Sequence, residues 1–373
     1  MHILFAGGGT AGHINPALAV AGYIRNVEKD VKISYIGKEG GLEATLVPEA
    51  GIDFYSIKVD GFKRSFSPSS IRKNIVAAKR AITASFAARK ILKELNPDIV
   101  MGTGGYVSGP VLREAHKLGI PTVIHEQNAF PGVTTKMLSD NADRVMLAMP
   151  EAEKHLKLKS APVITGNPVR ETVIHANPVE SKRKLGIENK TVILSFGGSL
   201  GARPLNEAVC SFIADNYKNK DLFFIHSTGK AGYDDCIAEL KEKGVDLGAE
   251  NLDIRRYISD MDVCMAAADI VICRAGAITL SELTVCGKPA VLIPSPYVAE
   301  NHQYHNAMTL VNASAAEIIE EKDLSGKALS DKVNKMIADK NTLKTMSANA
   351  KKCAISDANA RIYNVIKEVL LEK

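Results

Sequence analysis

Two glycine-rich loops of similar design carry the first chemical signal in this sequence. The apolar run Ile3–Ala6 leads into GGGTAGH at 7–13, and the apolar run 192–196 leads into GGSLGAR at 197–203. A stretch of helical pattern follows each loop. Glycines let the backbone approach a ligand closely, and the amides at a helix N-terminus bind phosphate readily. We therefore expect two phosphate-binding units in one chain, able to hold two phosphate-bearing molecules across a cleft.

Three further features of the first half could carry chemistry. His13 closes the first loop, and a histidine titrates near neutrality, so it could act as a general base beside phosphates. A second group of glycines lies at 102–105, directly after an apolar run. In the polar segment 125–128, Glu126 could be an acid–base group or orient one, and Asn128 could bond sugar hydroxyls. A packing histidine, a tight glycine turn and solvated loop residues are the alternatives.

Two polar turns in the second half follow apolar runs in the same way. After 270–273 the chain turns through RAGA, and the amides that open the next helix could bind a diphosphate, which the helix dipole favours by roughly 0.3–1 kcal/mol. Glu282, about one turn further on, could accept both hydroxyls of a ribose, although a carboxylate that caps the helix is the alternative. Asn301, His302 and Gln303 follow the run 290–293 and are suited to bonding a sugar.

Metal and redox signals are weak. Asp260 and Asp262 formally match the D-x-D pattern of metal–diphosphate sites, but this segment reads better as the start of a helix. The six cysteines show no C-x-x-C spacing, which argues against a zinc or redox motif. We expect reduced, mostly buried thiols, no metal site and no cofactor.

The positive charge of the chain is concentrated in one segment. The net charge is +5, yet the stretch from Lys58 to Lys93 holds ten basic residues and one acid, or +9, which leaves −4 for the rest. Basic amphipathic segments with aromatic residues bind anionic membrane surfaces, at about 1 kcal/mol per basic residue. A surface helix whose apolar stripe faces the core is the alternative, and a nucleic-acid partner is not expected. The residues expected at the membrane are Phe62, Lys63, Arg64, Phe66, Ile71, Arg72, Lys73, Ile75, Lys79, Arg80, Ile82 and Phe86.

The elements that must position these groups are short apolar strands alternating with helices. Such a pattern is typical of the doubly wound α/β class, in which ligands bind at the carboxyl ends of parallel strands. No apolar run approaches the roughly 20 residues that span a bilayer, and the start of the chain lacks the pattern of a signal peptide. The expected strands are 3–6, 32–36, 99–101, 122–125, 145–147, 163–164, 192–196, 222–226, 253–256, 270–273 and 290–293.

The length of 373 residues is typical of two domains. Prolines and glycines between 161 and 178 mark the boundary. We expect an N-terminal domain at 1–162, a C-terminal domain at 163–340 and terminal helices at 341–373.

Taken together, seven motifs resemble one family. They are GGTAGH at 8–13, GGY at 104–106, HEQN at 125–128, GNPVR at 166–170, GGSLGA at 197–202, CRAGA at 273–277 and NHQ at 301–303. In this order they are similar, nearly end to end, to the MurG family of peptidoglycan glycosyltransferases. The resemblance implies a GT-B fold, with two Rossmann-like doubly wound parallel-sheet domains facing across a cleft and the last helix packed back on the first domain.

The resemblance also implies an activity and a location. This family transfers N-acetylglucosamine, with inversion, from UDP-N-acetylglucosamine to the 4-hydroxyl of the N-acetylmuramyl sugar of undecaprenyl-linked lipid I, giving lipid II for peptidoglycan, without a bound metal. A member would lie at the cytoplasmic face of the cell membrane as a peripheral protein. Rival hypotheses are a glycosyltransferase with another lipid acceptor, a UDP-sugar epimerase, and a binding module without enzymatic activity.

Residue roles carry over only through the matching motifs. They make His13 and Glu126 the expected catalytic residues. The expected contacts of the acceptor pyrophosphate are Gly8, Gly9, Gly104, Gly105 and Tyr106. The expected contacts of the donor are Thr10, Ala11, Gly12, Asn128, Arg170, Ser199, Ile258, Ala277, Ile278, Thr279, Glu282 and Gln303. Family members often have glycine where this chain has Ala11.

Overall fold

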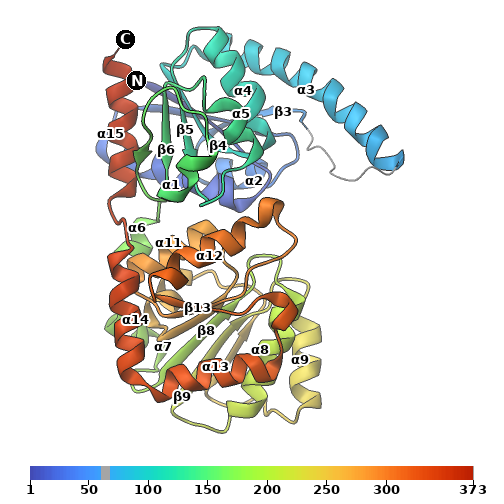
Figure 1. The fold of residues 1–373 in the computed structure, drawn as a ribbon, viewed down its shortest axis with the longest axis vertical. Helices are drawn as coiled ribbons and strands as arrows, with labels where there is room; N and C mark the ends of the chain where they lie inside the picture. Colours follow the sequence, from blue (N-terminus) through green and yellow to red (C-terminus); the bar gives the residue numbers. More distant parts are fainter. Residues whose placement is uncertain (60–67, 373) are drawn as a thin grey trace. The chain divides into compact units, whose positions relative to one another are not determined.

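The computed structural model describes residues 1–59 and 68–372 (Figure 1). The chain divides into two compact units. Unit 1 comprises Met1–Pro168 together with Asp357–Lys373, and unit 2 comprises Val169–Ser356. Each unit has its own parallel sheet with helices on both faces, so both units have the Rossmann-like, doubly wound α/β arrangement that the sequence predicts.

Within the described residues, unit 1 contains a seven-stranded parallel sheet in the order β3-β2-β1-β4-β5-β6-β7. Its strands are β1 (His2–Gly7), β2 (Lys32–Lys38), β3 (Asp53–Ile57), β4 (Ile99–Gly104), β5 (Thr122–Glu126), β6 (Arg144–Leu147) and β7 (Val163–Ile164). Its helices are α1 (Ala11–Val27), α2 (Glu43–Glu49), α3 (Pro68–Leu95), α4 (Gly105–Lys117), α5 (Val133–Leu138), the 3₁₀ turn η1 (Pro150–His155) and α15 (Ala358–Leu371).

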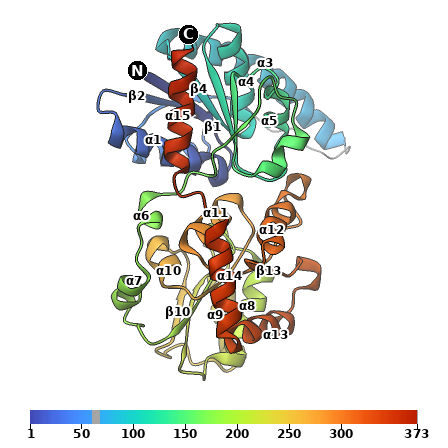
Figure 2. The ribbon, with the colours of Figure 1, turned by 60° about the vertical axis from the view of Figure 1, so that its left-hand side comes forward.

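The last helix belongs to the core of unit 1. Its apolar residues recur with helical spacing, and Ile362, Val365, Ile366 and Val369 are buried in the same cluster as residues of α1. Figure 2 shows α15 lying along unit 1, beside the sheet that holds β1 and β4. The chain therefore returns to its first unit after completing the second.

Within the described residues, unit 2 contains a six-stranded parallel sheet in the order β10-β9-β8-β11-β12-β13. Its strands are β8 (Thr191–Phe196), β9 (Leu222–Ser227), β10 (Leu252–Arg255), β11 (Ile270–Cys273), β12 (Ala290–Leu292) and β13 (Ala316–Ile318). Its helices are α6 (Glu171–Ile174), α7 (Pro178–Leu185), α8 (Arg203–Asn216), α9 (Tyr233–Glu242), α10 (Met261–Ala267), α11 (Ala277–Cys286), η2 (Ala299–Asn301), α12 (His302–Asn312), η3 (Glu321–Asp323), α13 (Gly326–Ala338) and α14 (Lys340–Lys352).

The observed elements differ from the expected ones mainly at the sheet edges. The strands β3 and β13 were not expected, because each is an edge strand of five or three residues with only partial burial. The unit division also differs from the expected boundary after residue 162. Because β7 pairs with β6, unit 1 continues to Pro168.

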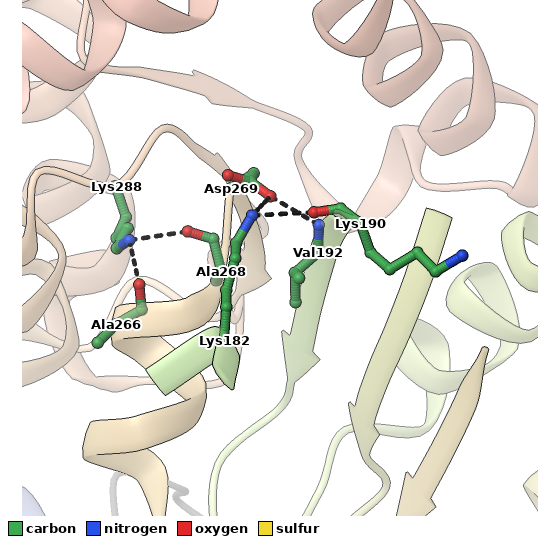
Figure 3. A network of polar contacts seen from close by, with 7 residues as sticks. All are labelled: Lys182, Lys190, Val192, Ala266, Ala268, Asp269 and Lys288. Atoms are coloured by element: carbon green, nitrogen blue, oxygen red, sulfur yellow. Dashed lines mark hydrogen bonds and ion pairs between the residues drawn. The ribbon is translucent and has the colours of Figure 1, made fainter. Parts of the chain in front are cut away.

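A polar network holds the amino ends of β8 and β11 in unit 2 (Figure 3). The buried Lys288 ammonium donates to the carbonyls of Ala266 and Ala268 at 2.7 and 2.8 Å. Asp269 accepts from Lys182 Nζ and from the Val192 amide, both at 2.7 Å. Burial lowers the pKa of Lys288 to about 8. This network lies at the opposite end of these strands from the glycine loop, so its role is to hold the sheet.

The helices of the described residues include none that is both long and apolar enough to cross a membrane.

Candidate functional site

His13 is held in one orientation at the carboxyl end of β1. The chain leaves β1 at Gly7 and begins α1 at Ala11, so His13 lies in the first turn of that helix. Its Nδ1 lies 3.1 Å from the Thr103 carbonyl and 3.3 Å from Gln127 Oε1. Both neighbours are acceptors, so Nδ1 carries the proton and donates. Nε2 is left with the lone pair that a general base requires.

The glycines at 104 and 105 make room for this arrangement. A Cβ at Gly104 would lie 2.7 Å from His13 Nδ1, and a Cβ at Gly105 would lie 2.1 Å from the Gly8 carbonyl oxygen. Their φ angles are 103° and 79°, which L side chains rarely adopt. Close packing against the first loop therefore explains why both positions are glycine, whether or not a ligand binds there.

Glu126 is buried, and both oxygens of its carboxylate accept hydrogen bonds from protein groups. One oxygen accepts from the Asn128 amide at 3.1 Å and from Asn128 Nδ2 at 3.0 Å. The other accepts from the Gly132 amide and the Thr135 hydroxyl. This geometry favours the orienting role over the acid–base role, since the carboxylate holds Asn128 and the turn that leads to α5.

The remaining expected residues of unit 1 lie on its surface, except Gly8, which is buried. Gly9, Thr10 and Gly12 are exposed, and Ala11 is half-buried. Tyr106, in the first turn of α4, is 54% exposed. Together they form the rim of the two glycine loops.

Unit 2 contains a cavity of about 440 Å³ at the carboxyl ends of β8, β11 and β12. The second glycine loop forms one side, and the starts of α11 and α12 with the segment after β12 form the other. Of the expected donor contacts, it includes Thr279 and Gln303. The residues that line it are Phe196, Gly197, Gly198, Gly201, Ala202, Arg203, Pro204, Arg274, Gly276, Thr279, Ser295, Tyr297 and Gln303.

Backbone packing shapes the glycine loop of this cavity. A Cβ at Gly201 would lie 2.1 Å from the Thr228 carbonyl oxygen, and a Cβ at Gly229 would lie 2.2 Å from the Gly201 nitrogen. The two loops therefore touch backbone to backbone. Gly198 has φ of 96° and no heavy atom within 4 Å of its Cβ position, so its side of the loop is open.

Arg274 connects three loops at this edge of the sheet. Its Nη1 donates to the carbonyls of Ile293 and Pro294 at 3.1 and 3.3 Å, and its Nη2 forms an ion pair with Glu321. Both charged side chains are largely buried. Since the Ser295 amide also donates to Gln303 Oε1 at 2.9 Å, the segment after β12 is fixed from two sides.

The start of α12 is set by an uncommon backbone geometry. Glu300 and Asn301 both have positive φ, at 55° and 49°, immediately before Gln303 enters the helix. Such consecutive left-handed residues cost energy and persist only where the surroundings hold them. The turn through these two residues leads into α12, where Gln303 lines the cavity.

Glu282 and Arg170 form a pair in unit 2 beside the cavity lining rather than in it. Arg170 Nη2 lies 3.6 Å from Glu282 Oε1, and the two side chains are 51% and 13% exposed. Burial raises the pKa of the Glu282 carboxyl, and the Arg170 charge opposes this rise. Glu282 lies on α11 and Arg170 lies just before α6, so the pair joins these two helices. As a carboxylate, Glu282 can also accept hydrogen bonds from a ligand that reaches α11.

Four other expected donor contacts occupy different settings. Ser199 is exposed in the open part of the second loop. Ala277 and Ile278 open α11, where the first amides of the helix lie. Ile258 is only 3% exposed, so a ligand would reach its backbone rather than its side chain.

The expected membrane segment is only partly described. Phe62, Lys63, Arg64 and Phe66 lie outside the described residues. The backbone of α3 covers the remainder, and Arg80 and Phe86 on this helix are exposed, Phe86 at 71%.

Within the described residues, no group of three or more histidine, cysteine or acidic side chains is placed to hold a metal ion. Asp260 instead accepts from Arg255 Nη1 at 2.6 Å. Cys210, Cys236, Cys264 and Cys273 are buried thiols.

Comparison with known proteins identifies the class of protein. Residues 3–147 match the glycosyltransferase family 28 N-terminal domain, and residues 192–362 match the glycosyltransferase family 28 C-terminal domain. The chain therefore belongs to glycosyltransferase family 28.

Relatives with a more specific name align along the whole chain. The chain is 46% identical over 374 residues to the UDP-N-acetylglucosamine–N-acetylmuramyl-(pentapeptide) pyrophosphoryl-undecaprenol N-acetylglucosamine transferase of Acetivibrio thermocellus, covering all of this chain and 99% of that one. The protein of the same name from Ruminiclostridium cellulolyticum is 44% identical over 373 residues, covering 99% of this chain and all of that one.

A solved structure agrees with these relatives. The crystal structure of Acinetobacter baumannii MurG matches with a TM-score of 0.78 and 29% identity, over 98% of this chain and 99% of that one. A UDP-GlcNAc 2-epimerase from Neisseria meningitidis matches with a TM-score of 0.67 at 14% identity over the full length of both chains, which shows a shared fold alone.

Proposed function

We propose that this protein transfers N-acetylglucosamine from UDP-N-acetylglucosamine to the 4-hydroxyl of the N-acetylmuramyl sugar of lipid I, with inversion, to give lipid II. The observation that carries the proposal is the geometry of His13. In a chain of glycosyltransferase family 28, a partly buried histidine is fixed by two acceptors so that Nε2 presents a lone pair. A sugar-transfer reaction needs such a group to take the hydroxyl proton as the new glycosidic bond forms.

Unit 2 supplies the chemistry for the sugar nucleotide. The bond from the sugar to the diphosphate breaks during transfer, so negative charge grows on the departing UDP. The first amides of α11, at Ala277, Ile278 and Thr279, and the dipole of that helix stabilise this charge. Glu282 accepts the two ribose hydroxyls. Arg170, Ser199, Ile258 and Gln303 complete the contacts from this unit.

Unit 1 supplies the base and binds the acceptor. The first glycine loop at Gly8 and Gly9, with Gly104, Gly105 and Tyr106, binds the acceptor pyrophosphate. Thr10, Ala11 and Gly12 at the start of α1 and Asn128, held by Glu126, contact the donor. The support for these roles is the exposure of the loop rim and the resemblance of its motifs to the family.

The direct test is the transfer of labelled sugar from UDP-N-acetylglucosamine to a soluble lipid I analogue. A reaction without acceptor and a reaction with UDP-glucose in place of the donor serve as controls. We expect label in the lipid product only with acceptor and the correct donor. Label released as free sugar, or epimerised donor in the absence of acceptor, would contradict the proposal.

We also propose that α3 and the segment before it bind an anionic membrane surface at its cytoplasmic face. The support is the basic composition of 58–93 and the exposed Phe86 and Arg80. Co-sedimentation with phosphatidylglycerol vesicles should exceed that with phosphatidylcholine vesicles, and Phe86→Ser should weaken it. The matched control is Val179→Ser, because Val179 is 74% exposed on unit 2. Equal losses in the two variants would contradict the assignment.

A further inference from the structure

Glu43 is a fully buried carboxylate behind the first glycine loop. It begins α2 and is 0% exposed. Burying a charge is costly unless hydrogen bonds replace its hydration. One Glu43 oxygen accepts from the Lys38 amide at 2.8 Å, and the other accepts from the Gly9 amide at 3.3 Å. The carboxylate therefore joins the end of β2 to the first glycine loop.

Three glycines leave the space that this side chain fills. A Cβ at Gly8 would lie 2.0 Å from Glu43 Oε1, and Cβ atoms at Gly37 and Gly41 would lie 2.5 and 2.6 Å from other Glu43 atoms. The absence of a side chain at Gly8 is therefore explained by Glu43 on this side of the loop. The glycine that remains open is Gly9, which has no heavy atom within 4 Å of its Cβ position.

The Glu43 charge is balanced by amides rather than by a cation. Across residues 1–59 and 68–372, no lysine or arginine forms an ion pair with it. It does act on the buried Tyr35, whose phenol pKa is raised first by burial and then by the Glu43 charge. A charge held by two amides alone constrains both of them, because losing either bond leaves the carboxylate underpaired.

We propose that Glu43 is the positioning residue of the first glycine loop. By holding the Gly9 amide from behind, it determines the loop shape to which the acceptor pyrophosphate binds. The identity of the ligand in this inference rests on the proposed function. The positioning of the loop rests on the contacts of Glu43 alone.

The substitution that tests it is Glu43→Gln. A carboxamide keeps the volume but has one oxygen and one NH₂ group, so either the Lys38 amide or the Gly9 amide would face a donor. The matched control is Glu49→Gln, which removes an exposed carboxylate from the same helix. We expect Glu43→Gln to raise the acceptor KM by about 10-fold or more, with a smaller rise in the donor KM, and the control to match the wild type.

A second measurement does not depend on turnover. Hydrogen exchange of the peptide that spans 7–14 should be faster in Glu43→Gln than in the wild type and in Glu49→Gln. If the wild type shows no sugar transfer but this exchange difference appears, the proposed function fails while the positioning by Glu43 stands.

Two results would overturn the inference. One is unchanged exchange in the loop, and the other is a Glu43→Gln variant whose donor KM rises as much as its acceptor KM. If Glu43→Gln does not fold, the same measurements are made on Glu43→Asp. This variant keeps the negative charge, but its side chain is one methylene shorter. The same two results would overturn the inference.

Discussion

The contact between two backbone loops in unit 2 allows a substitution experiment with an internal control. Gly198 and Gly201 lie in the same glycine loop, and their φ angles are 96° and 81°. Alanine at either position must adopt a left-handed backbone, which costs about 1–2 kcal/mol. The two positions differ in space, since Gly198 has no neighbour within 4 Å of its Cβ position and Gly201 has the Thr228 carbonyl oxygen at 2.1 Å.

Because the two Cβ positions differ in free space, the two alanine variants should differ in unfolding free energy. Real Cβ atoms essentially never approach an atom to within 3.0 Å, so Gly201→Ala must separate the loop from Thr228 by close to an ångström. Forcing extra volume into a packed contact costs about 1–3 kcal/mol. We expect Gly198→Ala to lower the unfolding free energy by about 1–2 kcal/mol and Gly201→Ala to lower it by about 2–5 kcal/mol.

Urea unfolding followed by circular dichroism measures this difference, since the chain has no tryptophan for fluorescence. Calorimetric titration with UDP adds a functional readout. Gly201→Ala should weaken UDP binding because it displaces a wall of the cavity. If the two variants have unfolding free energies within about 0.5 kcal/mol of each other, the close contact between the loops is refuted.

Three further predictions concern single side chains. First, His13→Ala should lower kcat, whereas Glu282→Ala should mainly raise the donor KM; steady-state kinetics with both substrates checks this, and full activity in both variants would refute the site assignment. Second, Glu321→Gln leaves the Arg274 guanidinium buried without its partner, so it should cost about 3–5 kcal/mol in urea unfolding and raise the donor KM. The control Glu320→Gln removes a more exposed pair with Lys322 and should cost under about 1 kcal/mol; equal losses would contradict the role of Arg274. Third, burial lowers the pKa of Lys288 in the folded chain to about 8 from its ordinary value of 10.5. Between these pH values the unfolded chain binds the extra proton, so the unfolding free energy should rise with pH, by up to about 1.4 kcal/mol per unit. Urea titrations at several pH values should show no such rise for Lys288→Met. If the unfolding free energy has the same slope against pH in both proteins, the prediction is refuted.

The sequence was sufficient to predict most of the fold because buried parallel strands are short apolar runs. The strands that begin at Ile99 and Ile270, for example, are buried throughout. The edge strand β3 has the sequence DFYSI and only its last residue is buried, so it lacks that signal. Helix α15 could be predicted for the opposite reason, since its apolar face repeats with helical spacing.

The individual roles of the glycines could not be predicted. Gly8, Gly104 and Gly105 look equivalent to Gly9 in the sequence, yet each has a protein neighbour that excludes a side chain. That distinction depends on residues far away in the chain, such as His13 for Gly104. Glu43 was missed for a similar reason. In the sequence it looks like an exposed acid in the first turn of a helix, and nothing nearby signals its burial.

Arg274 shows the same limit in unit 2. Its place after a buried strand marked the turn as a candidate site, but Glu321 lies 47 residues further on and forms its ion pair from a short 3₁₀ turn. Arg274 itself lines the cavity, so its orientation affects the binding surface. The sequence identified the turn, while the charge balance at the cavity became visible only in three dimensions.

The two glycine loops, so similar in sequence, differ in what supports them. The first is backed by the Glu43 carboxylate, and the second by the backbone of Thr228 and Gly229. Lipid I and the sugar nucleotide are both diesters of diphosphate with the same charge, so charge alone does not sort them between the two loops. What differs is the support behind each loop, a side chain at the first and backbone at the second. A side-chain substitution at Glu43 can therefore alter the first loop without a change in the second.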